Sequence, residues 1–513
     1  MEPSLSGTSS RFHAVWQRIR PYWWLAMLLI SGWWTVLAAQ QISTASIKGD
    51  ATQNLEIAIS LYQDGKFNLH KVPTALREPL PIAATALYFL ASGRDSSLLS
   101  MKNLHVGEHA RFVKLHNLGW VFLGLMGTWL LFNELTGTRW WGGLAAGASF
   151  IFFFNNVYVV DSLYTELHTA VLMIFVAWLM LLASRRQSGT LWLASGVGMG
   201  LLCLTKSAFL YISLVTIALM LVVMLLKRKG VRRPWLAALL MAMGLTCTIA
   251  PWMVRNQMLF DSPQISTGRG GWVLYKRALL NQMTDEEFRL AFALFGPRLY
   301  LHLMSGTSLA ITPEDHKMRS GRLSRLYAGK SDFSTDDMLA QGKGEPDRAH
   351  SLYRKTSALH IKLSREMEQA GHPFPEQAAD EKMQAMALQM IAEHPLSHLK
   401  LTGLMFWRGT WSFPPQLDIP LLPEGRWRAF FIESLNAVAM LALLVCFAYA
   451  LIRRNVRLLA FTALPVLMMA FYTLLSQNLP RFFAPAQPMM LMAVLLLLFH
   501  ALRSRPARTS LHE

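Results

Sequence analysis

Three acids and four cations lie near apolar runs of this sequence, where charge is costly and usually functional. They are Asp50, Asp161, Glu166, Arg77, Lys206, Arg255 and Arg481. A carboxylate can take a proton from an acceptor or hold a metal ion that does so. Lysine and arginine can neutralise charge on a departing phosphate. The set therefore suits substitution at a carbon that bears a phosphate leaving group, a reaction that needs no second carboxylate as general acid.

The first of these acids lies in a segment, residues 40–93, that is too polar to span a membrane. An apolar face at i, i+3, i+4 and i+7 predicts an amphipathic helix here, formed by Leu55, Ala58, Ile59 and Tyr62. After a turn, Arg77-Glu78-Pro79 precedes a second short helix, and we expect both helices to lie along the membrane surface. Asp50 also begins a capping-box pattern, Asp50-Ala51-Thr52-Gln53, so helix capping is the alternative to catalysis for this residue.

Composition indicates a polytopic membrane protein. The 513 residues are 53% hydrophobic, with a mean hydropathy of +0.30. The net charge of +18 comes from Lys and Arg clusters beside apolar runs, which is the positive-inside pattern rather than a nucleic-acid-binding surface. The cysteines lie in apolar runs, which favours buried thiols over disulfides. The first apolar run, 22–39, is expected to be an uncleaved anchor with a cytoplasmic N-terminus.

Basic clusters flank three long apolar runs at both ends, which predicts three membrane hairpins whose polar apices point outward. These runs are 139–186, 185–233 and 453–508. Their apices hold Asp161 with Glu166, then Lys206, then Arg481. Single crossings near 22–39, 113–135, 234–253 and 430–452 complete about ten helices with both termini cytoplasmic.

Residues 255–427 are polar and too long for a loop without structure, which predicts an external, mainly helical domain. Helical patterns cover Thr284–Phe295, Ser351–Ala370 and Met383–Glu393, and we expect Gly329–Asp347 to be mobile. We therefore divide the chain into three domains. They are a transmembrane module (1–253) that includes a catalytic first external loop (40–112), a periplasmic soluble domain (254–429) and a C-terminal transmembrane module (430–513).

Several segments, in chain order, resemble motifs of the GT-C membrane glycosyltransferases, particularly the branch with the bacterial aminoarabinose transferase and the protein O-mannosyltransferases. They are Asp50 with the turn 62–67, Arg77–Pro81, Gly200–Lys206, Pro251–Asn256 with 265–267 and 270–272, and Arg481–Pro485. The resemblance covers most of the membrane part and little of 284–427. No second acid follows Asp50, Phe482 stands where Tyr is usual, and Arg77 stands where some branches have Lys. These departures leave metal dependence and the sugar open.

The resemblance implies an inverting transfer of a sugar from a polyprenyl-phosphate donor to a glycan, lipid or protein acceptor. It implies an enzyme in a bacterial inner membrane, surrounded by membrane lipids, with its active site facing the periplasm. Asp50 would be the catalytic or metal-associated carboxylate, and either Asp161 or Glu166 the second acid near the acceptor. The donor phosphate would be bound by Arg77, Lys206 and Arg481, with Arg255 as an anchor that also touches substrate. A divalent metal ion is the one cofactor that the resemblance leaves open.

Other readings of the same residues stay open. Lys206 could extend to the outer interface, and Asp161 could cap the next span. A transporter or lipid flippase is one alternative function, but transporters favour charges near the bilayer midplane and inverted repeats. A catalytically inactive GT-C relative that acts as an assembly subunit is another. An enzyme requires Asp50, Arg77, Lys206 and Arg481 to converge, so their positions in the fold discriminate between these readings.

Overall fold

The computed structural model describes residues 22–93, 99–227, 231–317, 319–326, 335–411 and 426–504. Eight helical stretches in this part of the chain are long and apolar enough to cross a membrane. They lie on α2 (Trp23–Ala38), α6 with α7 (Gly107–Lys114 and Asn117–Thr136), α10 (Glu166–Arg186), α12 (Phe209–Leu226), α13 (Pro234–Phe260), α21 (Arg426–Ile452), α22 (Val456–Leu475) and α24 (Gln487–Arg503). The prediction of an α-helical polytopic membrane protein is confirmed.

Two of the expected crossings fall on shorter helices. They are α8 (Arg139–Ser149), which continues into the π-helical turn η4 (Phe150–Phe154), and α11 (Gly189–Cys203). Each has fewer than the roughly 20 residues that a full span needs. Both nevertheless pack inside the bundle, α8 against α7 and α11 against α10 and α13. The three predicted hairpins therefore correspond to α8–α10, α11–α12 and α22–α24.

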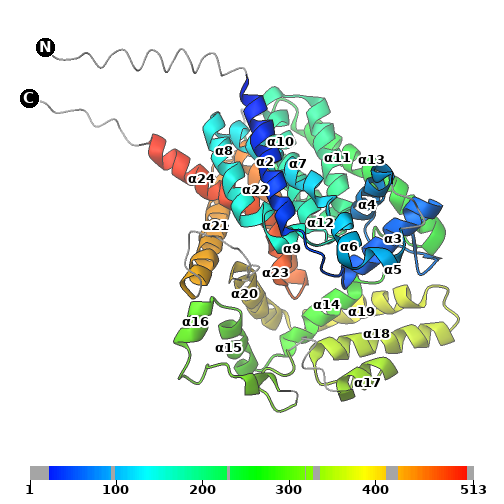
Figure 1. Cartoon of the computed structure of the whole chain (residues 1–513). Helices are drawn as coiled ribbons and strands as arrows, with labels where there is room; N and C mark the ends of the chain where they lie inside the picture. The colour runs from blue at the N-terminus through cyan, green and yellow to red at the C-terminus, as the bar shows by residue number, and fades with distance from the viewer. Residues whose placement is uncertain are drawn as a thin grey trace, which may run out of the picture.

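The polar apices of these hairpins gather at one end of the bundle, and the basic clusters gather at the other. The apices include α9 (Val157–Val160), α23 (Pro480–Phe483) and η7 (Ala484–Ala486). At the basic end, Arg457 donates to Glu134 O at 2.7 Å and Arg454 donates to Leu226 O at 3.0 Å. The helix α2 begins, and α24 ends, at this same end (Figure 1). This arrangement agrees with the prediction that each hairpin begins and ends on the same side of the membrane. That this side is cytoplasmic stays a prediction.

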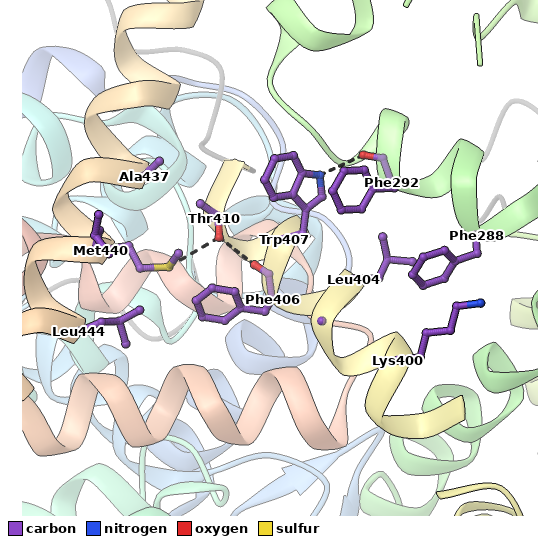
Figure 2. Close-up of a pocket in the computed structure, with 12 residues that line it drawn as sticks. Phe288, Phe292, Lys400, Leu404, Phe406, Trp407, Thr410, Ala437, Met440 and Leu444 are labelled. Carbon is purple, nitrogen blue, oxygen red and sulfur yellow. Dashed lines mark hydrogen bonds between the residues drawn. The ribbon is translucent and has the colours of Figure 1, made fainter. Parts of the chain in front are cut away.

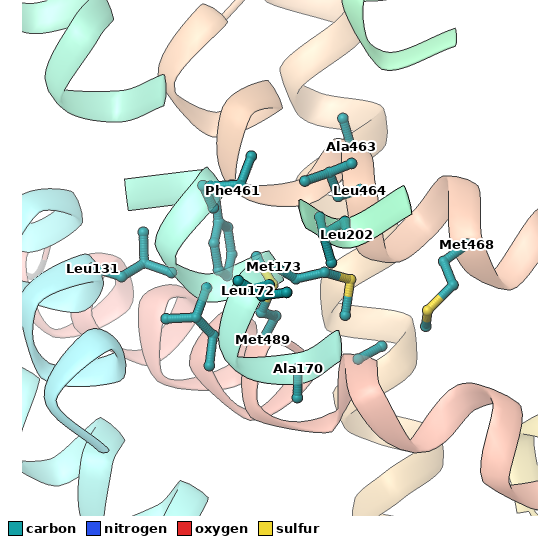
Figure 3. Close-up of a cluster of buried hydrophobic side chains, with 14 of the residues drawn as sticks. Leu131, Ala170, Leu172, Met173, Leu202, Phe461, Ala463, Leu464, Met468 and Met489 are labelled. Atoms are coloured by element: carbon teal, nitrogen blue, oxygen red, sulfur yellow. The ribbon is translucent and has the colours of Figure 1, made fainter. Parts of the chain in front are cut away.

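Glycine allows the closest helix contact in the bundle. A Cβ atom at Gly196 of α11 would lie 2.1 Å from Met241 O of α13, and one at Gly244 of α13 would lie 2.3 Å from Leu193 O. Such small-residue contacts let membrane helices approach until their backbones touch. The surrounding core is apolar, and Figure 3 shows side chains from α7, α10, α11, α22 and α24 meeting within it.

The first external segment folds as a small helical unit with its own core. It contains α3 (Asp50–Asp64), the two-stranded hairpin β1 (Asn68–Leu69) and β2 (Val72–Pro73), α4 (Pro79–Ser92) and α5 (Met101–Leu104), followed by α6. The predicted apolar face of α3 is confirmed, because Leu55, Ala58 and Ile59 are buried and Tyr62 packs beside them. In Figure 1 this unit lies between the membrane bundle and the external domain.

The segment predicted to form the external domain is helical, as expected, and we keep that name for it. Its elements are α14 (Gly270–Leu279), η5 (Leu280–Gln282), α15 (Asp285–Leu294), α16 (Arg298–Leu303), η6 (Pro313–His316), α17 (Thr335–Lys343), α18 (Leu352–Gln369), α19 (Pro375–Glu393) and α20 (Pro395–Trp411). Thr284 and Glu287 form a capping box at the start of α15. Within the segment expected to be mobile, 335–343 forms α17, whose Asp337 accepts hydrogen bonds from the amides of His350 and Ser351. Residues 329–334 lie outside the described residues.

We expect Gly196→Val to lower the stability of the membrane bundle, because a valine Cβ would meet the backbone of α13 and force the helices apart. Overpacking of this kind costs about 1–3 kcal/mol or more. Thermal unfolding in detergent would measure the loss. Gly32→Val, on α2, is the matched control, since a Cβ at Gly32 meets nothing within 4 Å. Equal melting temperatures for the two variants would contradict the close α11–α13 contact.

Candidate active site

Asp50 lies among guanidinium groups from three distant segments of the chain. Arg77 Nη2 is 2.7 Å from Asp50 Oδ1, and Arg269 Nη1 is 3.6 Å from the same oxygen. Arg481 Nη2 is 3.4 Å from Asp50 Oδ2. Gln53, one turn further along α3, accepts hydrogen bonds from Arg77 Nε at 2.9 Å and from Arg269 Nη2 at 3.4 Å. We call these five residues the Asp50 cluster; it unites three of the predicted site residues.

Local backbone structure presents this carboxylate to its partners. Gly49 adopts φ +63°, a left-handed conformation that favours glycine, and it is the N-cap of α3 without any side-chain cap. Asp50 therefore sits in the first turn, where the helix dipole favours a negative charge. Its carboxylate bonds to arginines and does not cap the helix, so the capping-box alternative is wrong.

The surrounding arginines determine the charge state of Asp50. Partial burial raises the pKa of this carboxyl, but the Arg77 hydrogen bond and the charges of Arg77, Arg269 and Arg481 outweigh burial and hold the pKa below its ordinary value. Asp50 is thus ionised at neutral pH. Because three cations surround one carboxylate, the Asp50 cluster carries surplus positive charge, to which a phosphate group would bind.

A second acid–base pair lies beside the Asp50 cluster. Lys206 Nζ is 3.2 Å from Glu166 Oε1, and both side chains are about nine-tenths buried. The ammonium group lies 5.7 Å from the ring centroids of Tyr472 and Phe482, which stack on each other. The Arg481 guanidinium lies 5.7 Å from the same Phe482 ring. Lys206 is therefore buried next to the cluster and does not extend to the interface.

Glu78 connects three of the segments that build the site. Its Oε1 atom accepts hydrogen bonds from the amide and the hydroxyl of Ser207, each at 3.2 Å, and Ser266 donates to the Ser207 hydroxyl at 3.0 Å. Sequence reasoning did not select Glu78, Arg269 or Gln53 as site residues. Glu78 belongs to the Arg77–Pro81 segment, and Arg269 directly precedes the segment 270–272. Both segments resemble GT-C motifs, so nearness to a motif is the feature of the sequence that could have indicated these two residues.

Two predicted site residues lie elsewhere and hold loops in place. Asp161 accepts from Lys114 Nζ at 2.9 Å and from Ser43, whose amide is 2.8 Å away. Asp161 follows α9, and α10 is preceded by Thr165, so this acid does not cap the next span. Arg255 donates to Thr74 O at 3.0 Å and lies over the Trp252 ring at 4.5 Å. Within the described residues, neither side chain contacts the Asp50 cluster.

The residues around Asp50 do not fit a divalent metal ion. Such ions take several oxygen ligands, usually more than one carboxylate for Ca²⁺, whereas the closest charged partners of Asp50 are guanidinium cations. Across the described residues, no group of three or more His, Cys, Asp and Glu side chains could hold a metal.

A cavity of about 490 Å³ lies outside the Asp50 cluster, where α15 and α20 meet the membrane helix α21 (Figure 2). Its walls are aromatic and aliphatic, among them Phe292, Leu404, Trp407 and Met440. Phe406, also in the wall, contacts Phe483, with ring centroids 6.5 Å apart. Phe483 belongs to α23, the same short helix that carries Arg481. The cavity thus adjoins the segment that supplies one of the cluster's arginines.

No family model and no curated protein matches this chain. Among solved structures, the oligosaccharyltransferase of Archaeoglobus fulgidus, tethered with an acceptor peptide, is 13% identical over 94% of this chain and 50% of its own, with a TM-score of 0.46. The oligosaccharyltransferase AglB from the same organism, in complex with an inhibitory peptide and a dolichol-phosphate, is 14% identical over 96% of this chain and 53% of its own, with a TM-score of 0.47. This chain thus spans about half the length of those proteins.

A third similar structure is ArnT from Cupriavidus metallidurans bound to undecaprenyl phosphate. It is 13% identical over 92% of this chain and 77% of its own, with a TM-score of 0.34. AglB and ArnT are both GT-C glycosyltransferases, the class that the sequence motifs resemble.

We expect Asp50→Asn to lower thermal stability at neutral pH, because three guanidinium groups would lose their shared anion. A carboxyl whose pKa is lowered by folding contributes stability that is lost as the pH falls through that pKa. The difference in melting temperature between wild type and variant should therefore stay constant from pH 8 to pH 5. It should shrink below about pH 4, where the carboxyl of an Asp in the unfolded chain becomes protonated. Tryptophan fluorescence during heating in detergent would measure the two melting temperatures at each pH.

The control for this measurement is Asp285→Asn, which removes an exposed ion pair with Lys400. Exposed pairs contribute about 0–1 kcal/mol, so its melting temperature should barely change. If Asp50→Asn melted at the wild-type temperature at pH 7, the ion pairing of Asp50 would be contradicted.

Proposed function

We propose that this protein is a GT-C type membrane glycosyltransferase that transfers a sugar from a polyprenyl-phosphate donor to an acceptor. The observation that carries the proposal is the Asp50 cluster, which combines one ionised carboxylate with surplus guanidinium charge at the polar end of a membrane bundle. A displacement at the anomeric carbon needs these two components: a base for the acceptor and cations for the departing phosphate. We assign the reaction to the periplasmic side of a bacterial inner membrane.

We assign the guanidinium groups of Arg481 and Arg269 to binding of the phosphate. The Nε atom of Arg481 is buried and has no hydrogen-bond partner among the described residues, so it is available to a ligand. Arg77, in contrast, is 7% exposed and is engaged by Asp50 and Gln53. We therefore assign Arg77 to the positioning of Asp50. Lys206, which is held by Glu166, contributes charge from its position 5.7 Å from the Phe482 ring centroid.

Phosphate binding would also activate the base. A carboxylate surrounded by guanidinium groups has a lowered pKa and is a weak base. A phosphate that draws Arg269 and Arg481 toward itself would weaken their contacts with Asp50 and raise its pKa. Asp50 would then take the acceptor proton as the sugar–phosphate bond breaks and the acceptor oxygen attacks the opposite face, which inverts the anomeric centre. Glu166 is the second acid in this proposal, because its partner Lys206 lies beside the Asp50 cluster, whereas Asp161 lies elsewhere with Lys114.

The apolar cavity in Figure 2 supports a lipid-linked donor. Leu441 of its wall belongs to α21 and is 61% exposed, so the cavity borders the surface that faces the membrane. The contact between Phe406 and Phe483 links the cavity to the helix of Arg481. We assign this cavity to part of the polyprenyl chain, whose phosphate would reach the Asp50 cluster.

The proposal predicts that Asp50→Asn abolishes sugar transfer in membranes supplied with a panel of radiolabelled polyprenyl-phosphate sugars. Loss of a general base lowers rates by roughly 10²–10⁴-fold. Glu56→Gln, on the same helix, is the matched control and should keep wild-type transfer. Equal transfer by wild type and Asp50→Asn would remove Asp50 from the reaction. No transfer by wild type from any donor would overturn the proposed activity.

Filling the cavity should weaken the use of long-chain donors. Gly403 lines the cavity, and a Cβ there meets nothing within 4 Å, so Gly403→Trp would occupy the space without a backbone clash. Each buried CH₂ contributes about 0.8 kcal/mol, so excluding a few carbons of the lipid chain from the cavity should lower the affinity for the donor about tenfold or more. Transfer from a long-chain donor should fall relative to a short-chain one. Gly119→Trp, also at an open position, is the control, and an unchanged chain-length preference would contradict this role.

A further inference from the structure

Tyr164 lies over Arg481, the arginine that the last hairpin apex supplies to the Asp50 cluster. The Tyr164 ring centroid is 4.8 Å from the guanidinium carbon of Arg481, which is the distance of a cation–π contact. The same carbon lies 5.7 Å from the Phe482 ring centroid, and Arg481 Nη2 is 3.4 Å from Asp50 Oδ2. Two aromatic rings and one carboxylate thus neighbour this guanidinium, and Tyr164 is the nearer ring.

The hydroxyl end of Tyr164 approaches the residue that precedes Asp50. It lies 3.6 Å from the position that a Cβ atom at Gly49 would occupy, and Gly49 is the N-cap of α3. One side chain therefore adjoins both the end of α3 that carries the proposed base and one of the arginines that the base binds. Sequence reasoning did not select Tyr164, although it lies between Asp161 and Glu166 in the same hairpin apex.

The loop that carries Tyr164 is anchored independently of Arg481. Asn54 Nδ2, from α3, donates to Leu163 O at 3.0 Å, and Asn117 Nδ2, from α7, donates to Ser162 O at 2.8 Å. The Leu163 side chain is buried in the core of the first external segment. Because these contacts fix the backbone directly before Tyr164, the fold places the ring and the arginine packs against it.

A ring on the face of a guanidinium group leaves its in-plane edges available. Guanidinium N–H groups donate within the plane of the group, whereas an aromatic ring covers the face. The Nε atom of Arg481 is buried and has no hydrogen-bond partner among the described residues. A ring that fixes the plane also fixes the direction in which Nε donates, and two parallel hydrogen bonds to a phosphate require that alignment.

We propose that Tyr164 is a positioning residue that holds Arg481 in place for the donor phosphate. This assignment rests on the proposed function, in which the phosphate draws Arg481 away from Asp50. During that exchange Arg481 gives up its contact with the carboxylate, while the Tyr164 ring, which carries no charge, keeps its contact with the guanidinium. Without the ring, the phosphate would have to order the arginine side chain itself, and binding would be weaker.

The test measures how tightly the full-length protein in detergent binds a polyprenyl phosphate without a sugar, by ligand-induced thermal stabilisation. The corresponding polyprenol, which lacks the phosphate, corrects for binding of the lipid chain. Tyr164→Leu should weaken phosphate-dependent binding roughly twofold to thirtyfold, the range of a cation–π contact. Tyr164→Phe keeps the ring and should bind as wild type does. Equal losses in both variants would assign the effect to the hydroxyl and overturn the proposal.

Two controls show whether the ring acts through Arg481. Tyr158→Leu makes the same substitution in the same hairpin apex, at a side chain that is 49% exposed, and should leave phosphate binding unchanged. Arg481→Gln should weaken binding at least as much as Tyr164→Leu, and the double variant should bind as Arg481→Gln does, since the two residues act as one unit. Losses that add in the double variant would contradict a positioning role.

The same measurement separates this assignment from the proposed function. If Arg481→Gln weakened phosphate binding and Tyr164→Leu did not, Tyr164 would have no positioning role, while the phosphate site would stand. Absence of phosphate-dependent stabilisation of wild type would overturn both the role of Tyr164 and the phosphate site. Neither result would replace the transfer test of Asp50→Asn, which addresses the activity itself.

Discussion

One carboxylate shared by three guanidinium groups connects the parts of this protein. Arg77 comes from the first external segment, Arg269 from the start of the external domain and Arg481 from the last membrane hairpin. Without Asp50 these cations would repel each other in a partly buried position. The ion pairs therefore do more than place a base: they hold three segments, which are far apart in sequence, against the polar end of the membrane bundle.

The same interaction explains how the site could respond to its substrate. Asp50 is ionised but occupied, so its basicity is low until another anion competes for the arginines. A phosphate group is such a competitor, because guanidinium binds it bidentately. Binding of the donor and readiness of the base would then be coupled by electrostatics alone, with no movement of a domain. Gln53, which accepts from Arg77 Nε at 2.9 Å, would keep Arg77 in place during the exchange.

Charge balance separates residues that hold the structure from residues available to ligands. Lys114 with Asp161 and Lys206 with Glu166 each pair one buried cation with one acid, and breaking such a pair typically destabilises a protein. The Asp50 cluster differs, because its three arginines exceed its one acid. The cluster lies where the start of the external domain meets the last hairpin apex, so a capacity to bind anions is concentrated there.

Sequence alone determined the membrane architecture, because apolar runs and their flanking basic residues act locally. It also selected seven candidate site residues, since charge beside apolar runs is costly enough to mark function; they are Asp50, Asp161, Glu166, Arg77, Lys206, Arg255 and Arg481. It did not identify Arg269, which lies in a polar segment where arginine is common, nor choose between Asp161 and Glu166. That choice depends on Lys114 and Lys206, which are 47 and 40 residues away from their acids. Only the tertiary structure decided which of these charges lie together, because the effect of a charge depends on its distance in space from its partners.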